Sequence, residues 1–228
     1  MKPIFVAATL IFILAVPAPA AAQDVKHNGQ GFFLSFSVHS LDFKGDFDKD
    51  LTLWCFEKAF FIPRMGKGVG LAIGIGYKHD SSFWDLTYLT STQKAQVQGR
   101  DGTATYHSAE ISGRLFLLKN FPLQPYLLGG ISLTWVTVGN GAQLFGSVLD
   151  ATYTGAGLNF GAGMILNLGP KLFIGGGVIY RLIKFLYAFG EGKGRDINDL
   201  RIGHDGPKLG RLLEAPCLGV AASVGFIL

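Results

Sequence analysis

From Gly31 to the end of the chain, apolar side chains recur at every second position, which is the pattern of β-strands and not of helices. In one stretch, Val69, Leu71 and Ile73 alternate with glycine and alanine. Each stretch therefore has one bulky apolar face and one small or polar face. The pattern predicts eight strands, at 31–42, 68–79, 82–91, 103–119, 125–138, 152–167, 171–187 and 218–228.

The links between these stretches alternate between short and long. Short turns on one side and long loops on the other are typical of outer-membrane barrels. An even number of strands returns both ends of the chain to the short-turn side. The short turns are at 79–82, 120–124 and 168–170, and the long links are at 43–67, 92–102, 139–151 and 188–216.

The two faces of the strands distinguish a membrane barrel from a soluble one. A soluble, lipocalin-like barrel would place its bulky apolar residues inside. Here the small faces carry the charged residues Glu110, Arg114 and Arg181, so we expect the apolar faces to meet lipid. Closing the sheet pairs every backbone group in hydrocarbon, and an eight-stranded interior has room only for packed side chains. We predict an all-β fold, an eight-stranded antiparallel transmembrane up-and-down β-barrel, with the soluble barrel as the alternative.

The first residues have the composition of a secretory signal peptide. Lys2 precedes an apolar run at 4–16, and small residues follow at 18–22. A run of about 13 residues at 1.5 Å each reaches only about 20 Å, too short for a helix that spans a hydrocarbon core of about 30 Å. We predict a signal peptide at 1–22, cut after Ala20 or Ala22, and a barrel over 23–228.

The overall composition agrees with this interpretation. Of the 228 residues, 49% are hydrophobic and 16% are charged, against about 25% charged in a typical soluble domain. After residue 22 there is no apolar run of about 18 residues, which excludes a bundle of membrane helices. The formal net charge of +4 is too small to predict a nucleic-acid partner.

Three segments resemble the OmpA-like and OmpX-like family of small outer-membrane barrels. They are 121–130, 155–163 and the pair Tyr180–Arg181. The resemblance implies an eight-stranded barrel that the outer-membrane assembly machinery inserts into the outer membrane of a Gram-negative bacterium. It does not imply one activity. We expect a monomer in contact with outer-membrane lipid and lipopolysaccharide.

The charged residues of the small faces predict a contact inside the barrel. Glu110 and Arg181 lie at similar distances from the short turns, so they are expected to form an ion pair across the narrow lumen, with Arg114 as a third lumen charge. Buried charges persist when they are paired, so we interpret these residues as a structural polar core. The alternative is an ion-conducting gate.

Two features of the long links suggest further sites. The segment 46–57 has acidic residues at positions 1, 3, 5 and 12 of a calcium loop but lacks the glycine at position 6, so we interpret it as an acidic, solvated surface loop without a metal. Cys55 and Cys217 form an even pair in an exported chain, which suggests a disulfide, with two free thiols as the alternative.

The last long link carries basic residues that are candidates for contact with lipopolysaccharide phosphates, with a solvated loop as the alternative. Trp84, Trp135 and Tyr187 are candidates for the aromatic girdles of a membrane barrel. The basic residues are Lys193, Arg195, Arg201, Lys208 and Arg211.

Catalytic motifs are weak. His39, the pair His107–Ser108 and the pair His204–Asp205 are present, but nothing in their spacing brings a nucleophile to a base. We therefore expect no catalytic residues, no metal and no cofactor. The predicted function is a structural or surface-interaction role, with a packed lumen and long outer loops. The alternatives are a lipid A modifying enzyme and a small-solute channel.

Overall fold

The fold is that of a computed structural model. It describes residues 30–55, 58–79, 81–118, 121–144, 147–190, 193–202 and 206–228. The described residues are mostly β-structure, with two short 3₁₀ helices, η1 (Gly45–Asp48) and η2 (Ile197–Asp199). No helix among these residues is long and apolar enough to cross a membrane. The predicted signal peptide lies outside the described residues.

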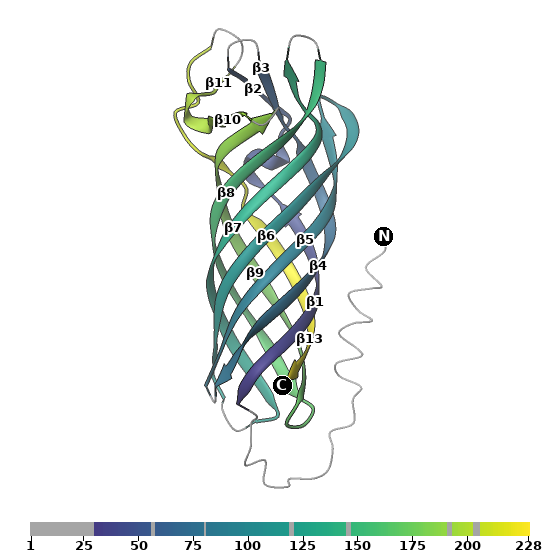
Figure 1. The fold of residues 1–228 in the computed structure, drawn as a ribbon, viewed down its shortest axis with the longest axis vertical. Helices are drawn as coiled ribbons and strands as arrows, with labels where there is room; N and C mark the ends of the chain where they lie inside the picture. Colours follow the sequence, from purple (N-terminus) through teal and green to yellow (C-terminus); the bar gives the residue numbers. More distant parts are fainter. Residues whose placement is uncertain are drawn as a thin grey trace.

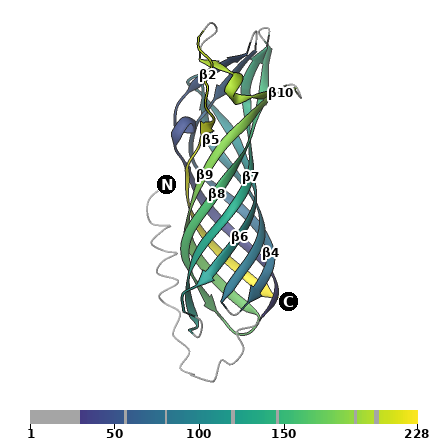
Figure 2. The ribbon, with the colours of Figure 1, turned by 90° about the vertical axis from the view of Figure 1, so that its left-hand side faces the viewer.

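Eight long strands of the described chain form a closed antiparallel barrel, whose shape is shown in Figures 1 and 2. Each strand pairs with the next, and the last pairs with the first, where Phe33 lies opposite Ile227 and Phe43 opposite Cys217. The predicted fold class is therefore confirmed. The strands are β1 (Gly31–Phe43), β4 (Arg64–His79), β5 (Ser82–Val97), β6 (Arg100–Phe116), β7 (Leu123–Leu144), β8 (Ser147–Asn167), β9 (Leu172–Gly190) and β13 (Cys217–Ile227).

A band of apolar side chains covers the outside of the barrel. These side chains are the alternate residues that the sequence places on the bulky faces, and each is about half exposed. Their neighbours along the strands point into the lumen and are buried. Because exposing so large an apolar surface to water is unfavourable, the band is the part of the wall that contacts lipid. It includes Ile73, Ile75, Leu86, Ile111, Ile131, Leu133 and Leu158.

Two of the predicted long links are part of the barrel wall. The expected link at 92–102 is wrong, because β5 and β6 continue to a two-residue turn at Gln98 and Gly99. Both turn residues have positive φ, 50° and 72°, as hairpin turns of this length require. The expected link at 139–151 is also wrong, because β7 continues past an irregularity at Asn140 and pairs with β8 up to Leu144.

In the outer ends of these strands the polarity of the two faces is reversed, although inward and outward positions still alternate. Ala95 and Val97 on β5 are buried inside the barrel, whereas Lys94 and Gln96 point outward and are exposed. Polar residues outside and apolar residues inside are the pattern of a barrel in water. The wall therefore extends beyond the lipid, and a sequence pattern that requires outward apolar residues misses this extension.

The remaining links form a rim at this end of the barrel (Figures 1 and 2). The hairpin of β2 (Leu51–Cys55) and β3 (Lys58–Ile62) adds to β7, with Lys58 opposite Leu144. Three short strands, β10 (Lys193–Asp196), β11 (Arg201–Ile202) and β12 (Leu213–Glu214), pair with β9, β2 and β9 respectively. We call this end the rim and the opposite end the turn end.

Candidate functional site

The lumen is packed in three layers, and the layer at the turn end is aromatic. The ring of Phe83 lies 4.9 Å from that of Phe33 and 5.2 Å from that of Phe173. The guanidinium of Arg114 lies over the rings of Phe83 and Tyr126, at 6.0 and 5.5 Å from their centroids. Such cation–π contacts join the aromatic layer to the charged layer beside it.

The middle layer is polar and contains the expected contact between Glu110 and Arg181. Arg181, which is fully buried, donates from Nε to Oε1 of Glu110 at 2.8 Å and from Nη2 to Oε2 at 3.2 Å. Two parallel charge-assisted hydrogen bonds hold both groups in one orientation. The two strands that carry them, β6 and β9, are not neighbours in the barrel, so the pair spans the lumen.

The third predicted lumen charge, Arg114, has a different partner. Its Nη2 lies 3.0 Å from Oδ2 of Asp85, and the hydroxyl of Ser112 donates to Oδ1 of the same carboxylate at 2.7 Å. Sequence reasoning did not select Asp85, although its place between Trp84 and Leu86 already put it on the inward face. The middle layer thus holds two ion pairs.

Several polar atoms of this layer have no hydrogen-bond partner among the described protein atoms. They include the hydroxyls of Tyr106, Ser108 and Thr134, Nδ2 of Asn159 and Nη1 of Arg181. Buried polar groups of this kind are usually satisfied by ordered water. We therefore expect water molecules in the middle layer, between two apolar layers.

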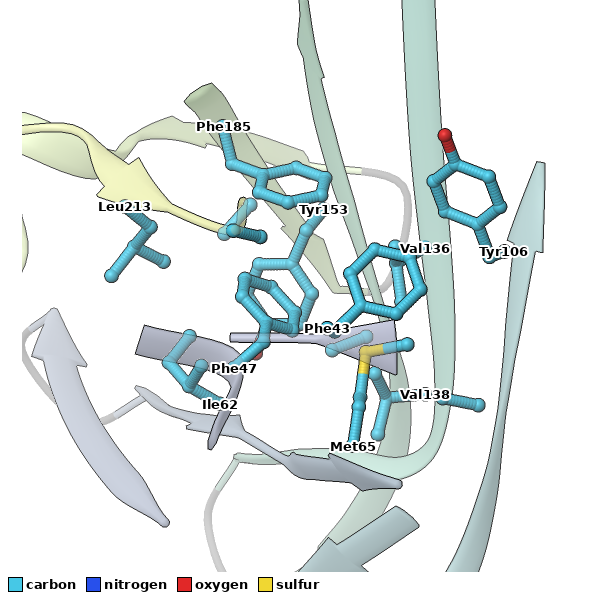
Figure 3. Packing of buried hydrophobic residues seen from close by; sticks show 14 of the residues in the cluster. Phe43, Phe47, Ile62, Met65, Tyr106, Val136, Val138, Tyr153, Phe185 and Leu213 are labelled. Atoms are coloured by element: carbon cyan, nitrogen blue, oxygen red, sulfur yellow. The ribbon is translucent and has the colours of Figure 1, made fainter. Parts of the chain in front are cut away.

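The layer toward the rim is apolar, and part of it comes from η1 (Figure 3). Phe47 is fully buried, 4.8 Å from the ring of Phe185 and 5.7 Å from that of Tyr153. The Tyr153 hydroxyl donates to the carbonyl of Phe61 at 2.9 Å, which ties the barrel wall to β3. We call η1 (Gly45–Asp48) the plug, because its Phe47 side chain packs among the wall residues in the outer half of the lumen.

An ion pair fixes the plug to the link before β13. Arg211 donates to both carboxylate oxygens of Asp46, at 2.6 and 2.8 Å, and the backbone N–H of Glu214 donates to Oδ2 at 3.0 Å. Gly45 has a φ of +76°, and a Cβ there would lie 2.5 Å from the carbonyl oxygen of Glu214. The interpretation of this segment as a solvated acidic loop is wrong for Asp46 and Phe47, because both are buried.

The ion pair gives the plug a pH dependence. The hydrogen bonds from Arg211 hold the pKa of the Asp46 carboxyl below its ordinary value of 3.8. A carboxyl whose pKa is lowered on folding stabilises the fold at pH values above its ordinary pKa. This contribution is lost as the pH falls through the folded-state pKa. We expect Asp46→Asn to lower the free energy of unfolding by about 1–2 kcal/mol at pH 7 and by less below pH about 4.

Urea unfolding of both proteins across this pH range measures the difference. The exposed carboxylate of Asp101, which accepts a hydrogen bond from the amide of Gln96 at 3.3 Å, provides the control variant Asp101→Asn. A difference between wild type and Asp46→Asn that is the same at pH 7 and at pH 3 would contradict this role of the carboxylate.

The expected disulfide is not formed, because Cys55 and Cys217 are both free thiols. Cys217 is buried at the start of β13, opposite Phe43. Cys55 lies at the tip of the β2–β3 hairpin, opposite Lys58, whose ammonium group donates to the carbonyl of Gly190 at the rim. The hairpin therefore carries Cys55 away from the wall position of Cys217.

The five basic residues proposed to contact lipopolysaccharide differ in their surroundings. Arg195 and Arg201 are exposed on β10 and β11, and the side chain of Lys193 lies outside the described residues. Lys208 lies 2.7 Å from Asp199, and Arg211 is bound to Asp46. The structure therefore shows that at least two of the five already have acidic partners within the chain.

The candidate catalytic residues that lie in the described part of the chain do not form a catalytic group. His107 points outward, while Ser108 is buried on the inward face, so the two cannot act on one substrate. Nε2 of His39 lies 2.9 Å from the hydroxyl of Ser37, but its Nδ1 has no partner among the residues that the structure describes. His204 and Asp205 lie outside the described residues.

A closed antiparallel barrel with an apolar outer band and a packed interior defines a membrane-spanning β-barrel protein. A family model described as the outer membrane protein beta-barrel domain matches residues 8–203, and the chain belongs to this family. No curated protein sequence matches the chain.

Solved structures share the fold. Neisserial surface protein A is 17% identical, with a TM-score of 0.56, and the match covers 87% of this chain and 97% of that one. The outer membrane protein OprG from Pseudomonas aeruginosa is 15% identical, with a TM-score of 0.51 and coverage of 90% and 99%. At these identities the likeness concerns the fold alone.

Proposed function

We propose that the protein is a non-enzymatic, non-conducting monomeric barrel in the outer membrane of a Gram-negative bacterium. The chain reaches this membrane after its signal peptide is cleaved, and the barrel assembly machinery inserts it. Its role is to present the rim at the cell surface. The observation that carries this proposal is the filled lumen, in which apolar layers close the polar layer from both sides.

The packing of the lumen argues against a channel, and the directions of the candidate catalytic side chains argue against a lipid A modifying enzyme. An ion or small solute would have to displace the Phe33–Phe83–Phe173 layer at one end and the plug at the other. A lipid A modifying enzyme would need a nucleophile and a base that meet at the lipid-facing surface, and Ser108, the partner of the outward His107 in the candidate pair, is buried on the inward face.

Conductance in a planar bilayer tests the proposal. We expect no current steps from the wild-type barrel or from Glu110→Gln, once a heat-dependent shift in gel mobility has shown that both are folded. Steps in the wild type that change in Glu110→Gln would overturn the proposal in favour of a gate at the Glu110–Arg181 pair. Overproduction that alters the mass of lipid A would overturn it in favour of an enzyme.

A further inference from the structure

The outward face of β5 changes chemistry in regular steps toward the rim. Along this strand the outward residues are Leu86 and Tyr88, then Thr90 and Thr92, and then Lys94. Successive outward residues on a strand lie about 6.7 Å apart. The wall therefore passes from apolar, through aromatic and hydroxyl-bearing, to cationic over about 27 Å.

Three aromatic rings from neighbouring strands form one continuous surface, which we call the aromatic shelf. His107 on β6 stacks on Trp135 of β7, with ring centroids 5.5 Å apart and an interplanar angle of 21°. Tyr88 on β5 shares a hydrogen bond of 2.8 Å with Nδ1 of His107. The hydrogen bond and the stacking hold the rings at the edge of the apolar band that is nearer the rim, next to Leu133, which is 65% exposed.

A row of four threonines crosses four strands directly beyond the shelf. Thr92 lies opposite Thr105, Thr105 opposite Thr137, and Thr137 opposite Thr152. All four are on the outward face and are at least partly exposed. The hydroxyls of Thr137 and Thr152 are 3.2 Å apart, and neighbouring strands place such groups at intervals of about 4.8 Å. The row offers hydrogen-bond donors and acceptors at regular intervals.

Two lysines lie next to this row. The pairing of β4 and β5 shifts between Met65 and Gly68, and this bulge sets Gly66 and Lys67 together opposite Lys94. Both side chains are exposed. Neither forms an ion pair with an acidic residue in the described part of the chain, unlike Lys208 and Arg211.

We propose that the aromatic shelf, the threonine row and these two lysines form a binding site for a phosphorylated sugar, the head group of lipopolysaccharide in the outer leaflet. This inference rests on the proposed outer-membrane location. The site adjoins the apolar band on the side nearer the rim. A glycolipid whose acyl chains cover the band therefore has its head group beside the site. Aromatic faces and hydroxyls suit sugar rings, and ammonium groups with no acidic partner in the described chain are available to attract phosphate.

Titration with deep-rough lipopolysaccharide in detergent micelles tests the site. Trp54→Phe and Trp84→Phe leave Trp135 as the only tryptophan, so that its fluorescence reports binding at the shelf. We expect saturable binding that weakens about 25-fold in Lys67→Gln/Lys94→Gln, because each lysine near an anionic membrane surface contributes a factor of about five. Thr105→Val/Thr137→Val is expected to weaken binding without changing its salt dependence.

The matched control removes two lysines that already have partners. Lys184 lies 3.3 Å from Glu214, and Lys208 pairs with Asp199, so Lys184→Gln/Lys208→Gln changes the net charge equally and should leave the affinity within about twofold. Equal loss in both double variants, or equal saturable binding of phosphatidylglycerol micelles, would overturn the site in favour of general charge attraction. Absence of binding by a heat-modifiable, surface-exposed barrel would overturn the site but leave the proposed function intact.

Discussion

Replacing Glu110 with alanine is expected to lower the free energy of unfolding by about 3–5 kcal/mol. The variant leaves the Arg181 guanidinium in the middle of the lumen with no counter-charge, and this side chain has no exposed surface. Removing one partner of a buried pair costs far more than the net stabilisation that the pair contributes, because the remaining charge is desolvated without compensation. Urea unfolding in lipid vesicles, followed by gel mobility, measures the change.

The double variant Glu110→Leu/Arg181→Met is the control for this prediction. It replaces both charged side chains with apolar ones, so it should recover most of the stability lost in Glu110→Ala. If the double variant is as unstable as Glu110→Ala, the loss comes from packing and not from the unpaired arginine. That result would contradict the role that we assign to the ion pair.

Replacing Phe47 with alanine is expected to lower the free energy of unfolding by about 3–5 kcal/mol, because it empties the space between Phe185 and Tyr153. The variant should also loosen the plug. Cys217 belongs to the same apolar layer and is fully buried, so its thiol reports on this change. In a Cys55→Ser background, we expect an impermeant maleimide to react with Cys217 faster in Phe47→Ala than in the unaltered plug.

Phe47→Leu keeps most of the apolar volume and serves as the control. It should lose much less stability than Phe47→Ala and should keep Cys217 unreactive. A Phe47→Ala protein with unchanged stability and an unreactive Cys217 would show that the plug does not hold the outer layer together.

The wall of the barrel could be predicted because its signal is local. Alternation along each strand, as in Val69, Leu71 and Ile73, depends only on neighbouring residues and on which face meets lipid. The same rule put Glu110 and Arg181 inside. It failed at the outer ends of β5 to β8, where water replaces lipid outside the wall and residues such as Val97 and Val138 turn inward.

The plug could not be predicted because its contacts join distant parts of the chain. Asp46 meets Arg211, which is 165 residues away, and the acidic residues around it resemble a solvated loop when they are considered alone. The cysteines show the same difficulty. Their position in neighbouring links suggested a contact, but the β2–β3 hairpin pairs with β7 and carries Cys55 across the rim.

Labelling of intact cells with an impermeant maleimide tests the central claim most directly. In a Cys55→Ser background, Arg100→Cys lies beside the rim turn of β5 and β6, and Leu168→Cys lies at the turn end between β8 and β9. We predict that the first variant is labelled on intact cells and the second only after the outer membrane is permeabilised. Labelling of Leu168→Cys but not Arg100→Cys on intact cells, or protein found free in the periplasm, would contradict the account.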